Sequence, residues 1–357
     1  MTSRFHWLDL LRFLAAFAVV ATHARGASLV PFAELDAADK TVLLAIFYGM
    51  TRIANEAVVV FFVLSGFLVG GRAMERIMSR SFQPAEYAID RVVRIMLPLV
   101  PALVLTSIVT VISHGKIDLI DLTGNLFSMQ GILVDTVSNN APLWSLSYEV
   151  WFYVLAFSIG LAVTSSSRAV APALLVIVAA IFTRLDATYL FCWLVGAYAY
   201  VFRPSRPSGL ILVGGLLLSL YGVVASQFGT DSDAVLTENL QQYVVSRDVA
   251  RILLSVGIAI VIQQCIQRAP RTRIAMTCDA LGTRLAAASY TLYLTHYPVM
   301  KLLHHTGIVA ARTNPIDSIA PFLVMLIVSF AVAYAFYWMF ERHTGKVRKI
   351  VKDRCAA

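Results

Sequence analysis

Ten apolar segments, each close to the length of a membrane-spanning helix, follow one another along this chain of 357 residues. A helix that crosses the hydrocarbon core of a bilayer needs about 17–25 mostly apolar residues. Hydrophobic residues make up 59% of the chain and charged residues 14%, whereas soluble domains are about a quarter charged. We therefore predict an all-α polytopic membrane protein with about ten transmembrane helices. The segments are centred on residues 7–24, 53–71, 93–112, 143–163, 169–183, 187–202, 208–226, 249–265, 286–303 and 318–340.

The Lys and Arg residues predict the orientation of these segments. If the N-terminus is cytoplasmic, the inner segments hold 19 of the 29 basic residues and the outer segments hold 8. Cytoplasmic loops carry an excess of Lys and Arg, so we expect both termini in the cytoplasm. The net charge of +8 comes from basic residues that lie between the apolar segments. This distribution indicates a lipid bilayer as the partner rather than nucleic acid. We expect a transmembrane domain over residues 1–345 and a basic cytoplasmic tail over 346–357.

The first apolar segment carries ionisable residues, which are costly inside a bilayer and usually functional there. Arg12 and His23 are eleven residues apart, about three helical turns, so they share one face about 16 Å apart along the axis. Asp9 lies three residues before Arg12, within reach of an ion pair. We read Arg12 and His23 as functional. The alternative is that Asp9 merely neutralises Arg12 and that His23 caps the helix at the interface.

The fourth segment begins APLWSLSYEVWFY and places Ser145 and Glu149 on one helix face. Glu149 would lie one to two turns below the outer surface, where a carboxylate needs a partner. His23, expected at the same level, is the candidate partner. The alternative is a protonated Glu149 that is hydrogen-bonded in the packed core.

Three further groups of polar residues are candidates for ligand contacts. Arg91 and Arg94 lie at the cytoplasmic end of the third segment, and guanidinium groups suit phosphate. The positive-inside rule would place them there as well. In the ninth segment Tyr290 and His296 share a broad face, which could line a cavity or pack in the core. Glu56, at the outer end of the second segment, could join an outer cluster or face water.

The Cys and His residues give no sign of a metal site. The four cysteines show no CxxC spacing, and no histidine has the neighbours that a metal site requires. We therefore expect no metal.

Five short motifs, taken together and in order, resemble the acyltransferase-3 family of integral membrane acyltransferases. They are LDLLRFLAAFAVVATH with its Arg12 and His23, FFVLSGFL at 61–68, the RxxR of Arg91 and Arg94, LWSLSYEVWFY at 143–153 and SYTLYLTHYP at 289–298. The resemblance covers nearly the whole chain. It implies a ten-helix enzyme of the bacterial inner membrane. Such an enzyme takes an acetyl or other short acyl group from coenzyme A and transfers it to a hydroxyl of a surface or secreted glycan.

The resemblance also implies roles for individual residues. Arg12 and His23 match residues taken as essential, Arg91 and Arg94 match a motif linked to coenzyme A, and Glu149 lies in a family block. From these we expect His23 as general base with Glu149 and Arg12 assisting, and acetyl-CoA held by Arg91, Arg94 and Arg12. We expect the acceptor, such as exopolysaccharide or lipopolysaccharide O-antigen, to contact Glu56, Ser145, Tyr290 and His296.

Two questions stay open at this point. The acyl group could pass directly to the acceptor, or through a serine such as Ser65, Ser145 or Ser147. A transporter or flippase of a glycan would also carry polar residues within its helices. The chain, however, lacks the internal repeats of many transporters.

Overall fold

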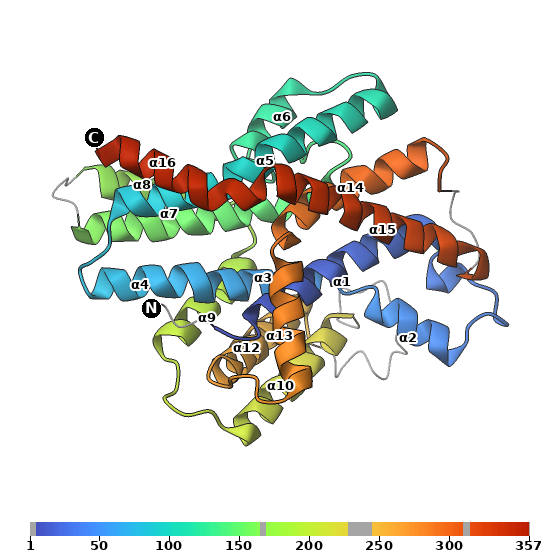
Figure 1. Ribbon diagram of the computed structural model, residues 1–357, viewed down its shortest axis with the longest axis horizontal. Coiled ribbons are helices and arrows are strands. Elements are labelled where there is room, and N and C mark those ends of the chain that lie inside the picture. Colours follow the sequence, from blue (N-terminus) through green and yellow to red (C-terminus); the bar gives the residue numbers. More distant parts are fainter. Residues whose placement is uncertain (1–4, 165–168, 228–244, 310–314, 357) are drawn as a thin grey trace. The chain divides into compact units, whose positions relative to one another are not determined.

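The computed structural model describes residues 5–164, 169–227, 245–309 and 315–356, and these residues are almost entirely helical (Figure 1). Seven stretches are helical, long and apolar enough to cross a membrane. They are Leu8–Ser28, Val42–Met78, Pro84–His114, Ala141–Thr164, Gly209–Gln227, Arg247–Cys265 and Ile319–Cys355. The remaining expected segments form the shorter helices α8 (Val170–Phe182), α9 (Ala187–Val201) and α14 (Ser289–His305). The prediction of an all-α polytopic membrane protein is thus confirmed.

The described helices belong to two compact units, each built from three stretches of the chain. Unit 1 comprises Met1–Arg12, Asn55–Tyr87 and Tyr148–Thr283, and unit 2 comprises Phe13–Ala54, Ala88–Ser147 and Arg284–Ala357.

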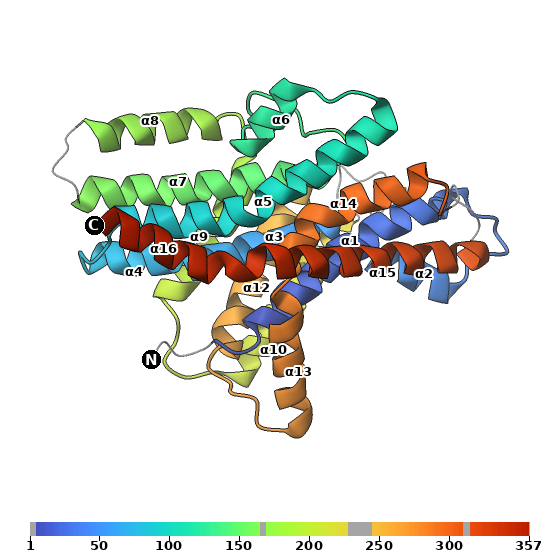
Figure 2. The ribbon, with the colours of Figure 1, turned by 45° about the horizontal axis from the view of Figure 1, so that its top comes forward.

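Unit 1 contains most of α7 (Trp144–Thr164) and α13 (Arg273–Ala286), together with α8 and α9. Its other helices are α3 (Ala54–Ser65), the π-helix η2 (Gly66–Gly71), α4 (Arg72–Met78), α10 (Gly209–Gln227) and α12 (Arg247–Cys265). Helices α10 and α12 lie side by side in Figures 1 and 2. Their contact is close because Gly222 faces the backbone of Leu254, and a Cβ at Gly222 would lie 2.7 Å from the Leu254 nitrogen. Small residues at helix contacts are how membrane helices approach one another closely.

A close helix contact in unit 1 joins α9 to η2 and to the end of α3 through two glycines. A Cβ at Gly66 would lie 1.9 Å from the backbone oxygen of Trp193. A Cβ at Gly196 would lie 2.1 Å from the backbone oxygen of Val63. The two backbones therefore touch where any larger residue would force them apart. A π-helical turn inside a longer helix is often found at functional sites, and here it begins at Gly66.

Unit 2 contains most of α1 (Leu8–Ser28) and of α5 (Pro84–His114), the short helices η1 (Phe32–Glu34), α2 (Val42–Met50), α6 (Leu119–Leu126) and η3 (Ala141–Leu143), and α14. It ends with α15 (Pro315–Met339), η4 (Glu341–His343) and α16 (Thr344–Ala356). Helices α14 and α15 pack side by side (Figures 1 and 2).

Unit 2 also contains one short helix outside the ten apolar segments, and a C-terminal helix. The apolar stretch 41–50 is a separate helix, α2, capped by Thr41, whose hydroxyl accepts from the Leu44 N–H. The expected boundary between residues 345 and 346 falls inside α16, which continues directly from η4.

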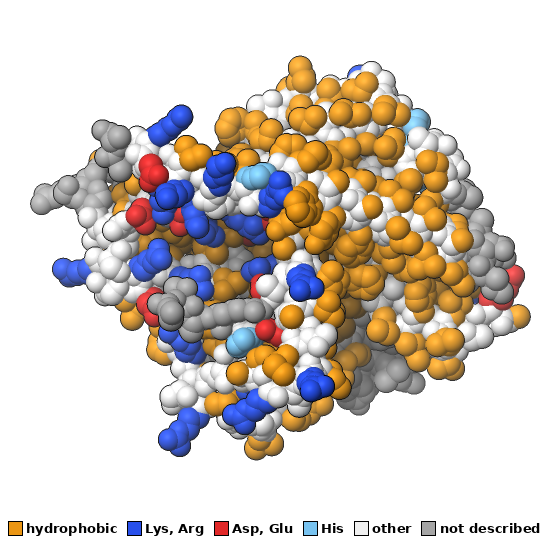
Figure 3. Space-filling view, viewed as in Figure 1, with side chains coloured by type: hydrophobic (Ala, Val, Ile, Leu, Met, Phe, Trp, Pro, Cys, Tyr) orange, Lys and Arg blue, Asp and Glu red, His pale blue; other side chains and the backbone are white. Residues whose placement is uncertain are grey.

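The spanning helices expose many large apolar side chains, as expected of surfaces that face lipid. In α5, Val100, Val104 and Ile108 are 46%, 54% and 52% exposed. Figure 3 shows hydrophobic side chains over much of the face in view. In water such a surface would drive aggregation, so these helices require a bilayer around them.

Candidate active site

Two histidines from distant parts of the chain meet inside unit 2. Nδ1 of His23, on α1, lies 2.9 Å from Nε2 of His296, on α14. Their rings stack with centroids 5.1 Å apart, and the ring of Tyr297 stands edge-on to His23. His296 is fully buried, whereas His23 is half-buried. Of the two imidazoles, His23 is therefore the more accessible one.

The backbone of α14 determines which nitrogen of each ring carries a proton. Nδ1 of His296 lies 3.0 Å from the Leu292 oxygen and 2.8 Å from the Tyr293 oxygen. Carbonyl oxygens only accept, so Nδ1 of His296 is the protonated donor and its Nε2 carries the lone pair. His23 then donates from Nδ1 to that lone pair. This leaves the lone pair of His23 on Nε2, which gives His23 one defined basic atom.

Tyr293, three residues before His296, fixes the start of α7. Its hydroxyl donates to the Pro142 oxygen at 2.7 Å, so the hydroxyl of Ser145 donates to the Tyr293 oxygen at 2.6 Å. Both side chains are buried. The proton of Ser145 is therefore engaged in a structural hydrogen bond.

Pro298 leaves a backbone acceptor in α14 without its helical donor, and Asn140 supplies a replacement. Proline has no N–H, so the carbonyl four residues earlier, that of Leu294, lacks its helical partner. The side-chain nitrogen of Asn140 lies 3.0 Å from the Leu294 oxygen and 3.0 Å from the hydroxyl oxygen of Thr106 on α5. Asn140 and Leu294 are completely buried. The loop before α7 is thus fastened to α14 two residues before His296.

The first turn of α14 contacts an ion pair. Nη1 of Arg94 lies 2.6 Å from Oε1 of Glu341, whose side chain is 1% exposed. The second oxygen of Glu341 accepts from the backbone N–H of Thr291, at 3.2 Å, and from its hydroxyl. Ala288, at the N-cap of α14, has no side-chain acceptor. Glu341 supplies the acceptor that an N-cap side chain would otherwise provide. The guanidinium of Arg94 also lies over the Tyr290 ring, 5.3 Å from its centroid.

These contacts appear in a fixed order along α5. Arg94 contacts Glu341 and the first turn of α14, and Thr106 contacts Asn140, which binds just before His296. Arg94 and Thr106 are twelve residues apart, about 18 Å along a helix axis. In unit 2, the arginine site therefore lies at the level of Arg94 on α5, and the histidine pair lies near the level of Thr106.

Arg91 lies in unit 2, three residues before Arg94 on α5, whereas Arg12, Glu149 and Glu56 lie in unit 1, each with contacts of its own. Nη1 of Arg12 pairs with Asp9 at 3.4 Å. Glu149 accepts a hydrogen bond from Tyr153, whose oxygen accepts from Ser65 at 3.3 Å. Glu56 is buried and accepts from Ser226 and, at 2.9 Å, from the side chain of Gln227.

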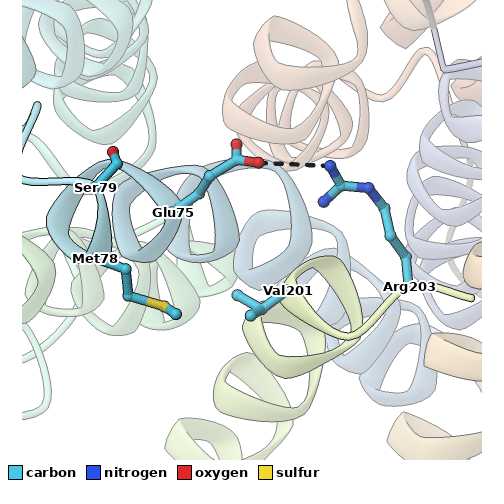
Figure 4. A pocket seen from close by; sticks show the side chains of 5 residues that line it. All are labelled: Glu75, Met78, Ser79, Val201 and Arg203. Atoms are coloured by element: carbon cyan, nitrogen blue, oxygen red, sulfur yellow. Dashed lines mark hydrogen bonds and ion pairs between the residues drawn. The ribbon is translucent and has the colours of Figure 1, made fainter.

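Unit 1 also has an open pocket of about 520 Å³ between α4 and the end of α9, lined by Glu75, Met78, Ser79, Val201 and Arg203. Figure 4 shows Glu75 and Arg203 pointing toward each other across it, with 3.5 Å between the carboxylate oxygen and Nη2. Tyr200 also donates to Glu75 at 2.8 Å. None of the site residues expected from sequence lines this pocket.

The expected pairing of His23 with Glu149 stays a prediction, because the two residues belong to different units; within its own unit His23 pairs with His296, and Glu149 pairs with Tyr153. Tyr290 and His296 share α14, and the Tyr290 ring lies beneath the guanidinium of Arg94. Sequence reasoning missed Glu341 and Asn140. Glu341 could have been noticed as a carboxylate directly after the last apolar segment. Pro298 signals an unbonded carbonyl, although not which side chain will bind it.

The fold and these polar groups define an integral membrane protein in which a buried histidine contacts a half-buried one and a buried carboxylate pairs with a partly exposed arginine. The family model described as "Acyltransferase domain" matches residues 5–338, nearly the whole chain. The chain belongs to this family, acyltransferase-3, and is a membrane acyltransferase. Neither a curated protein nor a solved structure matches it. Among the residues that the structure describes, no group of three or more His, Cys, Asp or Glu could hold a metal ion.

Proposed function

We propose that this protein is an O-acetyltransferase of the bacterial inner membrane. It moves a short acyl group from cytoplasmic acetyl-CoA to a hydroxyl of an extracytoplasmic glycan, such as exopolysaccharide or lipopolysaccharide O-antigen. The observation that carries the proposal is the half-buried His23, whose basic nitrogen is selected by a buried partner. Family membership favours this function over a glycan transporter or flippase.

His23 acts as the general base in this proposal. Its Nε2 takes the proton of the acceptor hydroxyl while the oxygen attacks the thioester carbonyl carbon. The C–S bond then breaks, and the coenzyme A thiolate leaves with the proton that His23 returns. The new bond is an ester, so no other reactant is needed. His296 keeps Nδ1 of His23 as a donor throughout, which holds the ring orientation through both proton transfers.

Arg91 and Arg94 bind the phosphates of the donor. A guanidinium has five N–H donors, and the Arg94 side chain is 37% exposed beside Glu341, so its geometry suits an additional phosphate contact. The separation of about 18 Å along α5 suits a donor that carries its phosphates far from its thioester. Arg12 is a further proposed donor contact, on the grounds of its sequence motif.

Direct transfer is favoured over a serine ester intermediate. A nucleophilic serine needs a base that takes its proton. Ser145 donates to Tyr293, Ser147 to the Trp144 oxygen and Ser65 to Tyr153. Glu56, Ser145, Tyr290 and Glu149 stay proposals as acceptor contacts or as assisting groups. The contacts of Ser145 and Tyr290 favour structural roles for both.

Mass spectrometry of surface glycans tests the proposal, with cells that carry the wild-type gene, no gene or a variant. Loss of the gene should remove an acetyl increment, and His23→Ala should remove it equally. The matched control is His114→Ala, because His114 is exposed at the end of α5. Purified wild-type protein should consume acetyl-CoA only with the glycan present. An unchanged glycan without the gene, or full acetylation by His23→Ala, would overturn the proposal.

A further inference from the structure

The pocket between α4 and the end of α9 presents two side chains of opposite charge to one opening. Oε1 of Glu75 and Nη2 of Arg203 face each other at 3.5 Å (Figure 4). This distance is long for a charge-assisted hydrogen bond, which is about 2.7–2.9 Å. The side chains of Glu75 and Arg203 are 53% and 36% exposed, so both are accessible from outside. A ligand that carries both charges can therefore replace this loose ion pair by two closer ones.

Tyr200, a buried residue of α9, holds both charged groups in place. Its hydroxyl donates to Oε2 of Glu75 at 2.8 Å. Its backbone oxygen accepts from Nη1 of Arg203 at 2.6 Å, and its ring lies beneath the guanidinium, 4.3 Å from ring centroid to Cζ. Gly71 leaves room for this tyrosine, because a Cβ at Gly71 would collide with the Cβ of Tyr200. The two charges are thus positioned before a ligand arrives, so less conformational freedom is lost on binding.

The pocket lies where two apolar helical stretches end. The stretch Val42–Met78 is long and apolar enough to span a membrane, and α9 ends at Val201. Met78 and Val201 line the pocket together with the charged pair. At the same end of α9, the rings of Tyr198 and Phe202 lie 4.4 Å apart and the two residues are 64% and 61% exposed. Exposed aromatic side chains are typical of the level of the lipid headgroups, so a phospholipid is the ligand that this pocket meets.

The two charges select among phospholipid headgroups. Phosphoethanolamine carries a primary ammonium, which can donate to Glu75, and a phosphate, which suits the guanidinium of Arg203. Within the described part of the chain, Arg203 makes two hydrogen bonds, which leaves N–H groups for a phosphate. Choline has no N–H and is bound by aromatic rings, whereas none of the five described side chains that line the pocket is aromatic. Phosphatidylglycerol brings no cation to Glu75.

We infer that Glu75 and Arg203 form a binding site for the headgroup of phosphatidylethanolamine. The ammonium group binds the Glu75 carboxylate, and the phosphate binds the Arg203 guanidinium. Met78 and Val201 contact the apolar part of the lipid next to the headgroup. The Lys and Arg distribution predicts that this lipid belongs to the cytoplasmic leaflet. No residue proposed for acyl transfer lines the pocket, so the inference does not depend on the proposed reaction.

Lipid titrations of the full-length protein in detergent, followed by native mass spectrometry, test the site. The lipids carry identical acyl chains, so only their headgroups differ. The wild type should bind phosphatidylethanolamine about three- to ten-fold more tightly than phosphatidylcholine, as expected for one charge-assisted contact at a half-exposed site. Glu75→Gln should remove this preference, because the amide offers no charge to the ammonium. Arg203→Gln should weaken both lipids by a similar factor, because both carry the phosphate.

Arg206→Gln and Asp353→Asn are the matched controls, because each removes one charge from an exposed side chain outside the pocket. Each should leave the affinity for both lipids within about two-fold of the wild type. Equal affinity of the wild type for phosphatidylethanolamine and phosphatidylcholine would overturn the inference. Equal losses in Arg203→Gln and Arg206→Gln would do the same. So would tighter binding of phosphatidylglycerol, because the pocket would then recognise net negative charge.

A coupling reaction on the wild type avoids dependence on the folding of variants. A water-soluble carbodiimide joins a carboxylate to a primary amine as an amide and takes up the water that is released. In nanodiscs that contain phosphatidylethanolamine, mass spectrometry of peptides should find this lipid coupled to Glu75 more often than to the exposed Asp353. Coupling at Glu75 should saturate as the fraction of phosphatidylethanolamine rises, as the occupancy of a site does. A proportional rise without saturation, or equal coupling at both carboxylates, would overturn the inference.

Discussion

Removal of the Asn140 side chain should destabilise the protein because Pro298 has made that side chain necessary. In Asn140→Ala the Leu294 oxygen stays buried and loses its donor, and Thr106 loses one hydrogen bond. An unsatisfied buried carbonyl costs about 1–3 kcal/mol, and a lost neutral hydrogen bond about 1 kcal/mol. The amide oxygen of Asn140, itself buried without a hydrogen-bond partner among the described residues, is removed as well, which offsets part of this cost. We expect a net loss of about 1–3 kcal/mol.

The proline makes this expectation sharper. In Pro298→Ala, residue 298 regains an N–H that can donate to the Leu294 oxygen within the helix. The Asn140→Ala change should then cost about 1–2 kcal/mol less than it does in the wild type, a coupling typical of residues that share a partner. Asn125→Ala is the matched control. Asn125 is also fully buried and donates to two backbone oxygens, those of Asp121 and Asp135, neither of which Pro298 affects.

Unfolding of the purified protein by a titration with sodium dodecyl sulfate in mixed micelles measures these free energies. The four proteins of the cycle and the corresponding four with Asn125→Ala give two coupling energies. Additive effects for Asn140 and Pro298, within about 0.5 kcal/mol, would refute the assignment of Asn140 as the replacement donor. Equal coupling for Asn125 would refute it too, because the effect would then reflect a general softening of α14.

Three further results are expected. In steady-state assays, His296→Ala should lower kcat about 10–100-fold with little change in KM for the acyl donor. His296→Gln, which keeps an acceptor near the position of Nε2, should recover part of the lost kcat. A changed KM for the acyl donor with an unchanged kcat would contradict the tautomer argument. Glu341→Gln should raise KM for acetyl-CoA more than it lowers kcat, because the partner that orients Arg94 loses its charge; an unchanged KM would separate Arg94 from donor binding. Gly66→Ala should cost about 1–3 kcal/mol in the same unfolding assay, because its Cβ meets the Trp193 oxygen. Gly209→Ala, with no atom within 4 Å of its Cβ, should be close to neutral, and similar costs at both sites would show that steric contact is not the cause.

The sequence predicted the helices well because hydrophobicity and length are local properties of the chain. All ten apolar segments became helices. The helix repeat also placed Ser145 and Glu149 one turn apart. It could not give the partner of either, because partners depend on which helices are neighbours.

The site was predicted less completely for that reason. His23 and His296 are 273 residues apart, and no periodic pattern links them. A shared membrane level suggested Glu149 as a partner of His23, but level alone cannot identify the contacts that either residue makes. Polar side chains bound to backbone atoms, such as Asn140 at Leu294, are harder still. Any donor of suitable length could satisfy that carbonyl.

Helix α14 makes four attachments within two turns: to Glu341 at Thr291, to Pro142 at Tyr293, to Asn140 at Leu294 and to His23 at His296. A slide or rotation of this helix by one residue would break all four together. The proposed active site of unit 2 is therefore expected to form or to be lost cooperatively, as one unit. Partial activity in variants around α14 should reflect a mixture of intact and collapsed molecules, and single-molecule traces would show it as switching between two levels.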